Sequence, residues 1–399
     1  MKSNIPIILI ATLFCSIACF VFIKATNLNN PVVFVPDHDE TSNAVGDNTL
    51  IKSNENLIQV ALLLDTSGSM NGLLEQAKSQ LWNIVNQLSE TEKQGQETNL
   101  EIALYEYGNP AKAQRPNEIN LLSSFTSDMD LISKKLFELS TNGGDEYCGT
   151  IIKTSLEELE WGSDESMKFI YIAGNEGFNQ GPIDYKKACA QAKEKAVVVN
   201  TIFCGDAQEG INLHWKTGAY LADGDYMNIN HNEETVYIES PYDDEINEWN
   251  KKLNKTYMPF GKEGSQKAMN QNLQDSNASA YGKSNIASRA KFKASKKYKA
   301  ESWDLVDAYE KDKSIIKKAK PSNEEHQVLS IEDLEKAVQQ AAIERADIKS
   351  NISGLSKKRR DYVDAEKAKS KTANKSDLEQ SIIESVKKQA KKKGYEFKN

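Results

Sequence analysis

An apolar run that ends in a short polar turn constrains this chain more than any other feature. Residues 57–64 are almost wholly apolar and lead directly into Asp65-Thr66-Ser67-Gly68-Ser69. Behind the turn, apolar residues recur with the spacing of one helix face: Leu73, Leu74, Ala77, Leu81, Ile84, Val85 and Leu88. The segment therefore predicts a buried strand, a tight turn and an amphipathic helix.

The same alternation of strand and helix continues to about residue 258. Further strands are predicted at 100–107, 118–125, 167–173, 196–203 and 225–230, and helical patterns separate most of them. Only ten residues separate 107 from 118, too few for a helical crossover, so these two strands should pair antiparallel at a sheet edge. The predicted fold class is α/β: a doubly wound, mostly parallel six-stranded sheet with helices on both faces. In it, the first strand should neighbour 167–173.

The turn after the first strand carries chemistry that suits a metal ion. Asp65, Ser67 and Ser69 offer one carboxylate and two hydroxyls at the carboxyl end of a strand, where ligands of open α/β sheets bind. Oxygen ligands favour a hard divalent cation. The topology should bring the loops at Asp145 and Glu176 to the same crevice. The alternative is a turn whose side chains only cap the following helix.

Asp65-Thr66-Ser67-Gly68-Ser69 resembles the D-x-S-x-S motif of von Willebrand factor type A domains, and the element order over 56–258 is similar to theirs. The chain as a whole resembles bacterial members that are membrane-anchored or secreted. The resemblance implies a metal-ion-dependent adhesion site, where Mg²⁺ (or Mn²⁺) is held by oxygen ligands from three loops. An acidic side chain of a partner protein would complete the coordination.

The resemblance carries ligand roles onto particular residues. Asp65, Ser67 and Ser69 match the first loop directly. In the second loop, Thr150 matches the family's Thr, and Gly143-Gly144-Asp145 matches a run found in some members. The third loop departs from the pattern, since Ala173-Gly174-Asn175-Glu176 stands where the family has Thr-Asp-Gly. Glu176 is the candidate acidic ligand there.

The C-terminal third differs in composition from the rest of the chain. Residues 1–260 contain 19 Lys and Arg against 37 Asp and Glu, whereas residues 261–399 contain 31 against 21. No strand pattern appears after Gly261, so 259–399 is predicted to be a Lys/Glu-rich helical extension. Aromatic residues are not interleaved with the basic ones as base stacking requires, and no nucleic acid partner is expected.

Within the extension, apolar residues alternate by three and four from Ile331 to Tyr362. The pattern favours a coiled coil at 330–364 or a long helical hairpin. Self-association through these helices, binding of another partner, and packing of the helix on its own domain remain open.

The N-terminus has the composition of a membrane segment. Residues 5–23 contain no charged side chain and are long enough to span a bilayer. An uncleaved signal anchor is one interpretation; a lipoprotein signal is the other, because Ser16-Ile17-Ala18-Cys19 resembles a lipobox with Cys19 as the lipidated residue. Either makes 1–24 the membrane signal and 25–55 a polar linker. The bulk of the chain is then expected to be tethered outside the cytoplasm, at the periplasm or cell surface.

The cysteines and histidines indicate neither a zinc site nor a catalytic one. An extracytoplasmic domain permits a disulfide, for which Cys189 and Cys204 are the candidates, with buried free thiols as the alternative.

A D-x-D phosphotransferase motif would need Asp where Ser67 stands, and no P-loop or dinucleotide fingerprint occurs. We therefore expect no enzyme, but a tethered, metal-assisted protein-binding module. The alternative is a metal-independent scaffold whose helical tail drives oligomerisation.

Overall fold

The first strand occupies an interior position of a six-stranded sheet. The computed structural model describes residues 56–111, 119–229, 238–322, 324–369 and 378–397. The strand order is β5-β4-β1-β6-β7-β8, with these bounds: β1 (Leu57–Asp65), β4 (Asn99–Tyr107), β5 (Asn120–Thr126), β6 (Met167–Gly174), β7 (Val198–Cys204) and β8 (Tyr226–Ile229). Only β5 pairs antiparallel, with β4. The predicted fold class is confirmed, including the antiparallel edge and the β1–β6 neighbours.

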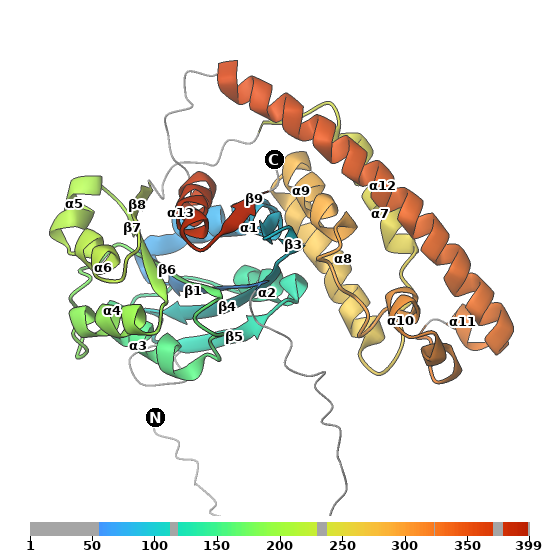
Figure 1. Ribbon diagram of the computed structural model, residues 1–399, viewed down its shortest axis with the longest axis horizontal. Helices are drawn as coiled ribbons and strands as arrows, with labels where there is room; N and C mark the ends of the chain where they lie inside the picture. The colour runs from blue at the N-terminus through green and yellow to red at the C-terminus, as the bar shows by residue number, and fades with distance from the viewer. Residues whose placement is uncertain (1–55, 112–118, 230–237, 323, 370–377, 398–399) are drawn as a thin grey trace, which may run out of the picture. The chain divides into compact units, whose positions relative to one another are not determined.

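Helices cover both faces of this sheet because side chains alternate along each buried strand. One face packs against α3 (Cys148–Glu158), α4 (Tyr185–Glu194) and α6 (Trp215–Leu221), with α5 (Ala207–Asn212) beside them (Figure 1). The other packs against α1 (Asn71–Ser89), α2 (Met129–Phe137) and α13 (Leu378–Lys392). The side chains of β1 divide between these two faces. Leu63 packs in the core of the first face, and Val60 packs in the core of the second.

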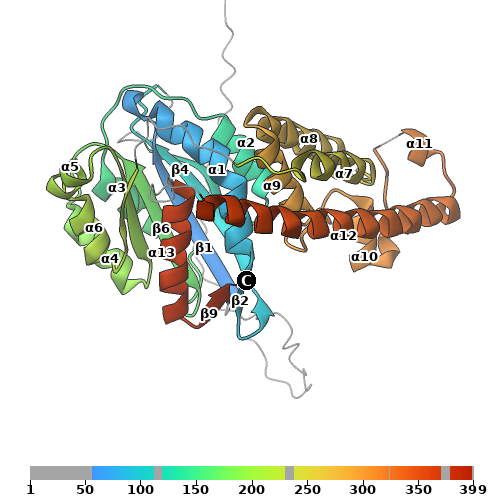
Figure 2. The same ribbon diagram turned by 90° about the horizontal axis from the view of Figure 1, so that it is seen from above.

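The extension is helical and packs behind α1. Its helices are α8 (Gly264–Ala280), α9 (Lys283–Ala294), α10 (Leu305–Lys311), α11 (Glu324–Gln327), α12 (Ile331–Lys369) and α13, with a 3₁₀ turn at Lys313–Lys317. The helix before them, α7 (Asp243–Lys255), packs with α9 and α12. A second 3₁₀ turn, Gly68–Met70, follows β1. Helix α9 lies against α1, and α12 lies against α7, α9 and α10 (Figure 2). The described residues from 56 onward therefore form one compact unit. The division into domains at 258 stays a prediction.

The middle of the apolar repeat of α12 is covered by the same chain, whereas its two ends, Ile331 and Tyr362, are exposed. Leu334, Val338, Ile348 and Ile352 are buried against elements of the extension and the core behind α1. The structure thus shows these residues of the helix packed on their own chain, as one of the three alternatives predicts.

The mainly helical extension also contains one short strand, at the C-terminus, where the sequence has no strand pattern. β9 (Tyr395–Phe397) pairs antiparallel with β2 (Thr91–Lys93), which also pairs with β3 (Gln96–Glu97). Gly394 adopts a φ of 72°, which ends the last helix and turns the chain into β9. A strand of three residues is too short to produce an alternating sequence pattern.

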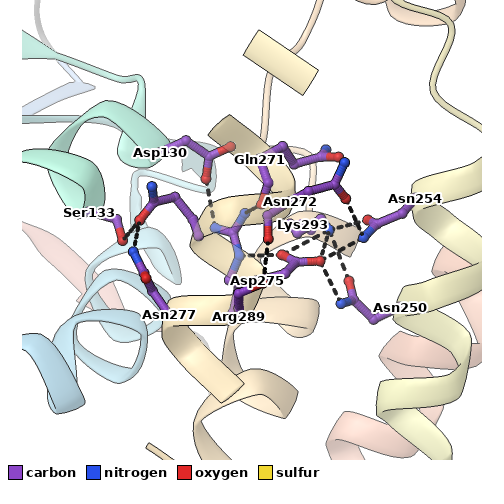
Figure 3. Close-up of polar contacts among 12 residues, drawn as sticks. Asp130, Ser133, Asn250, Asn254, Gln271, Asn272, Asp275, Asn277, Arg289 and Lys293 are labelled. Atoms are coloured by element: carbon purple, nitrogen blue, oxygen red, sulfur yellow. Dashed lines mark hydrogen bonds and ion pairs between the residues drawn. The ribbon is translucent and has the colours of Figure 1, made fainter. Parts of the chain in front are cut away.

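A buried ionic network joins α2 to the extension (Figure 3). The guanidinium of Arg289 on α9 lies 2.6 Å from Asp130 Oδ1 on α2 and 2.5 Å from Asp275 Oδ1 on α8. Lys293 Nζ lies 2.9 Å from Asp275 Oδ2 and donates to Asn250 Oδ1 on α7 at 3.0 Å. Each buried charge in this network is paired with a buried charge of opposite sign. Removal of one partner would leave the other buried and unpaired, so the packing of α2 on the extension depends on all of them.

The predicted disulfide between Cys189 and Cys204 is not formed, and this is a correction. Both are free, buried thiols. Cys189 on α4 belongs to the core on one face of the sheet, whereas Cys204 at the end of β7 belongs to the core on the other. The sheet itself separates the two side chains.

The predicted membrane segment 5–23, the lipidation candidate Cys19 and the linker 25–55 lie outside the described residues. Among the residues that are described, no helix combines the length and apolar character needed to cross a membrane.

Candidate metal centre

Asp65 is the last residue of β1, and its side chain is 0% exposed. Its Oδ1 accepts a hydrogen bond from the backbone N–H of Ser67 at 2.7 Å, which shapes the turn. Its Oδ2 is buried and has no hydrogen-bond partner. A buried carboxylate oxygen without a partner costs free energy, and a bound cation would remove that cost.

Backbone hydrogen bonds draw four loops together around this carboxylate. Thr66 N donates to Tyr107 O at 2.9 Å, and Asn142 N donates to Thr66 O at 2.9 Å. The Tyr107 hydroxyl donates to Ala173 O at 2.9 Å. The loops that follow β1, β4 and β6 therefore meet the loop that precedes α3 at one edge of the sheet, as the parallel topology predicts.

The first loop presents its two serine hydroxyls side by side. Ser67 Oγ and Ser69 Oγ are 3.3 Å apart. Ser69 Oγ also accepts from Asn175 Nδ2 at 3.0 Å, which ties the loop after β1 to the loop after β6. The third loop thus contributes the side-chain amide of Asn175 next to the site, one residue before the predicted Glu176.

Glu176, the predicted third-loop ligand, has an exposed side chain that points to its own loop. Its Oε2 accepts from Gln180 Nε2 at 3.3 Å. Its backbone carbonyl accepts from the indole N–H of Trp215 at 2.7 Å, which anchors the loop. The backbone of Glu176 therefore reaches the site through a hydrogen bond to Glu146, and its carboxylate acts on Glu146 only through charge, which raises the pKa of that residue.

In the second loop, Glu146 and not the predicted Asp145 is the buried acid beside Asp65. Asp145 is exposed and accepts from the Tyr147 hydroxyl at 2.8 Å. The next residue, Glu146, is 4% exposed, and its carboxyl interacts with the side chains of Asp65 and Ser67. Its Oε2 is buried without a hydrogen-bond partner. Sequence reasoning missed Glu146; its place at the predicted start of the following helix was the available signal.

Thr150, the predicted second-loop hydroxyl, lies in the first turn of α3. Its N–H donates to Tyr147 O at 3.0 Å, and its Oγ1 is buried without a partner. Together with Asp65 and Glu146, it leaves three buried oxygen atoms unsatisfied in neighbouring loops. Native proteins rarely leave such groups without a partner.

The electrostatics of the site oppose two charged carboxylates without a cation. Burial, and then the nearby Glu146 carboxylate, raise the pKa of Asp65 well above its usual range. Burial raises the pKa of Glu146 as well, although hydrogen bonds from Asp65, Ser67 and the Glu176 backbone oppose that shift. A divalent cation between the two groups would stabilise both charged forms.

Two glycines leave the room that the carboxylate of Asp65 needs. A Cβ at Gly108 would lie 2.9 Å from Asp65 Oδ1, and a Cβ at Gly174 would lie 3.3 Å from Asp65 Oδ2 and 2.7 Å from the Tyr107 hydroxyl. Gly174 stands where the resemblance predicts an Asp. The third loop therefore has a glycine, and no carboxylate, at the position that closely approaches Asp65.

The donor set fits a hard divalent cation. It comprises the Asp65 and Glu146 carboxylates with hydroxyls of Ser67, Ser69 and Thr150, all oxygen, which suits Mg²⁺ or Mn²⁺ with water in the remaining positions. Within the described ranges, no group of three or more His, Cys, Asp and Glu side chains could hold a metal ion.

Comparison with known proteins supports the same architecture. The family model of the von Willebrand factor type A domain matches residues 59–214. None of the curated proteins compared with the chain matches it significantly.

Solved structures similar to the chain share little sequence with it. BatB from Bacteroides thetaiotaomicron has 16% identity and a TM-score of 0.33, and the match covers 54% of this chain and 97% of that one. The SpRpn10 VWA domain has 17% identity and a TM-score of 0.31, with 43% and 88% covered. Proximal thread matrix protein 1 from the mussel byssus, described with a zinc-occupied MIDAS motif, has 16% identity and a TM-score of 0.32, with 43% and 41% covered. The match thus spans less than half of the mussel protein, and we base no argument on these likenesses.

Proposed function

Residues 59–214 are a von Willebrand factor type A domain, and from that premise we propose that this protein captures a partner protein through a divalent cation bound beside Asp65. Domains of this family are generally interaction modules, in keeping with the lack of an expected catalytic constellation. A bound cation would supply a coordination position open to an acidic side chain of the partner.

The three unsatisfied oxygens carry this proposal: Asp65 Oδ2, Glu146 Oε2 and Thr150 Oγ1. All are buried, and the loops that bear them converge at the end of the sheet where ligands of this fold class bind. Asp65, Ser67, Ser69, Glu146 and Thr150 would hold Mg²⁺ or Mn²⁺. The exposed face of the site, at Gly68 and Ser69, leaves the approach to the cation open.

The proposal includes the tether expected from residues 5–23, by which the module would act outside the cytoplasm. A scaffold with an oligomerising tail is less well supported, because the apolar face of α12 already packs within the chain.

Isothermal titration of residues 53–399 with Mg²⁺ and Mn²⁺ tests the site. We expect saturable binding in the wild type and none in Asp65→Ala. Crosslinking to a membrane fraction, with and without EDTA, tests the function. A partner recovered from the wild type but lost in Asp65→Ala and in EDTA supports the proposal; capture that neither treatment alters would overturn it.

A further inference from the structure

A cavity lies on the side of α1 away from the sheet, apart from the candidate metal centre. It has a volume of about 150 Å³, and its lining residues come from α1, α9, α12 and the start of α13. Figure 2 shows α12 running across the extension toward α13. Asn86 on α1, Lys291 on α9, and Ser356, Arg359, Arg360 and Lys367 on α12 are among the residues that line it. Several separate elements therefore meet at one polar hollow with room for more than one water-sized group.

The wall of this cavity carries more positive than negative groups. Lys291, Arg359, Arg360 and Lys367 face only two acids among the lining residues, Asp364 and Glu379. The carboxylate of Glu379 already accepts a hydrogen bond from Asn83 Nδ2 at 2.9 Å. Positive charge that lines a partly enclosed hollow attracts an anion more strongly than the same charge in open solvent.

Two of the cations are positioned by acids that do not line the cavity. Lys291 Nζ lies 2.5 Å from Glu90 Oε1, and Arg359 Nε lies 2.7 Å from Asp243 Oδ1. The other two retain donor capacity: Arg360 Nη1 is 3.9 Å from Glu90 Oε2, beyond hydrogen-bond distance, and Lys367 has no ion pair with any described residue.

An unsatisfied hydroxyl points to the same conclusion independently. Ser356 is 7% exposed and lines the cavity, and its Oγ has no hydrogen-bond partner. The hydroxyl of a serine in a helix commonly donates a hydrogen bond to the backbone carbonyl four residues earlier. A buried serine hydroxyl that makes no such bond is available to a ligand.

We propose that this cavity binds a small tetrahedral oxyanion of the phosphate class, either free or as a small monoester. The Arg360 guanidinium would donate charge-assisted hydrogen bonds, the Ser356 hydroxyl would donate a neutral one, and Lys367 would supply a point charge. The anion would bridge α12 to α1 and α9, and so stabilise the packing of the extension on the type A domain.

Titration calorimetry on the full chain, at constant ionic strength in chloride, tests the proposal with two probes: inorganic phosphate and glycerol 3-phosphate. We expect saturable binding at one site and a higher melting temperature with ligand. Binding of both probes with similar affinity indicates a free oxyanion, and tighter binding of the glycerol ester indicates a monoester; each supports the site.

Matched variants distinguish specific binding in this cavity from non-specific attraction of an anion to basic side chains. Arg360→Gln and Ser356→Ala should each weaken affinity, Arg360→Gln roughly tenfold or more. Lys357→Gln removes the same charge from an exposed position on the same helix and should bind as the wild type. Absence of saturable binding of either probe, or equal weakening by Lys357→Gln and Arg360→Gln, would overturn the proposal.

Discussion

The carboxyl group of Glu146 lies close enough to that of Asp65, at the carboxyl end of β1, to raise the pKa of Asp65 further beyond the effect of burial, and the two residues have exposed fractions of 4% and 0%. They belong to different loops, which the parallel topology brings together. Because charged carboxylates in a buried site repel each other, the pair raises the free energy of the metal-free protein. This relationship distinguishes Glu146 from its neighbour Asp145, whose side chain is exposed.

Glu146→Gln should weaken Mg²⁺ and Mn²⁺ binding at least tenfold, because it removes one of two carboxylates from the proposed coordination sphere. Isothermal titration of residues 53–399 measures the change. Asp145→Asn alters the adjacent acid in the same loop and should leave affinity unchanged. If Asp145→Asn causes the greater loss, the assignment of Glu146 is wrong.

Asp65→Asn should stabilise the metal-free protein at neutral pH, by about 1 kcal/mol or more. The folded pKa of Asp65 is raised above its usual value of 3.8. The protonated carboxyl therefore favours folding at low pH, and this contribution is lost as pH rises through the folded pKa. Urea denaturation in EDTA should show the difference between variant and wild type growing with pH; a difference that shrinks as pH rises contradicts the prediction.

Arg289→Met should lower the free energy of unfolding by about 3–5 kcal/mol, because Asp130 and Asp275 would remain buried without their shared cation. Chemical denaturation measures it. Lys251→Met, which breaks the exposed pair with Glu248, is the control and should change stability by no more than about 1 kcal/mol. Similar effects of the two substitutions would show that the buried network does not stabilise the fold.

Ile352→Ala should cost about 2–4 kcal/mol, because this side chain is fully buried where α12 packs on its own chain. The melting temperature should not depend on protein concentration, as it would if the helix formed an intermolecular coiled coil. Ile343→Ala, on the same helix but 67% exposed in the wild type, should have little effect. Concentration-dependent melting of the wild type would contradict intramolecular packing.

A chain that ends at residue 258 should fold less stably than one that ends at 399. The shorter chain lacks α9 and α13, both of which pack on α1, as well as β9. It would expose apolar side chains of α1 that the extension covers, so we expect aggregation or a lower melting temperature by differential scanning calorimetry. Equal melting temperatures would make 258 a true domain boundary.

The local sequence was sufficient for the sheet and for the position of the site. Periodicity identified the six strands most clearly where they are buried along nearly their whole length, as in β1 and β6. The short predicted connection between 107 and 118 was enough to place β5 antiparallel. The Asp65 turn was recognisable because Asp65, Ser67 and Ser69 lie at alternate positions within five residues.

Tertiary structure decided what depends on contacts between distant residues. Asp145 and Glu146 are adjacent acids in one loop, and only the approach of Asp65 and the loop after β6 determines that Glu146 is buried. The sheet separates Cys189 from Cys204, although both looked suitable for a disulfide. The apolar repeat of α12 likewise specifies a face to be buried but not its neighbour, because the hydrophobic effect is non-directional and any complementary surface can cover it.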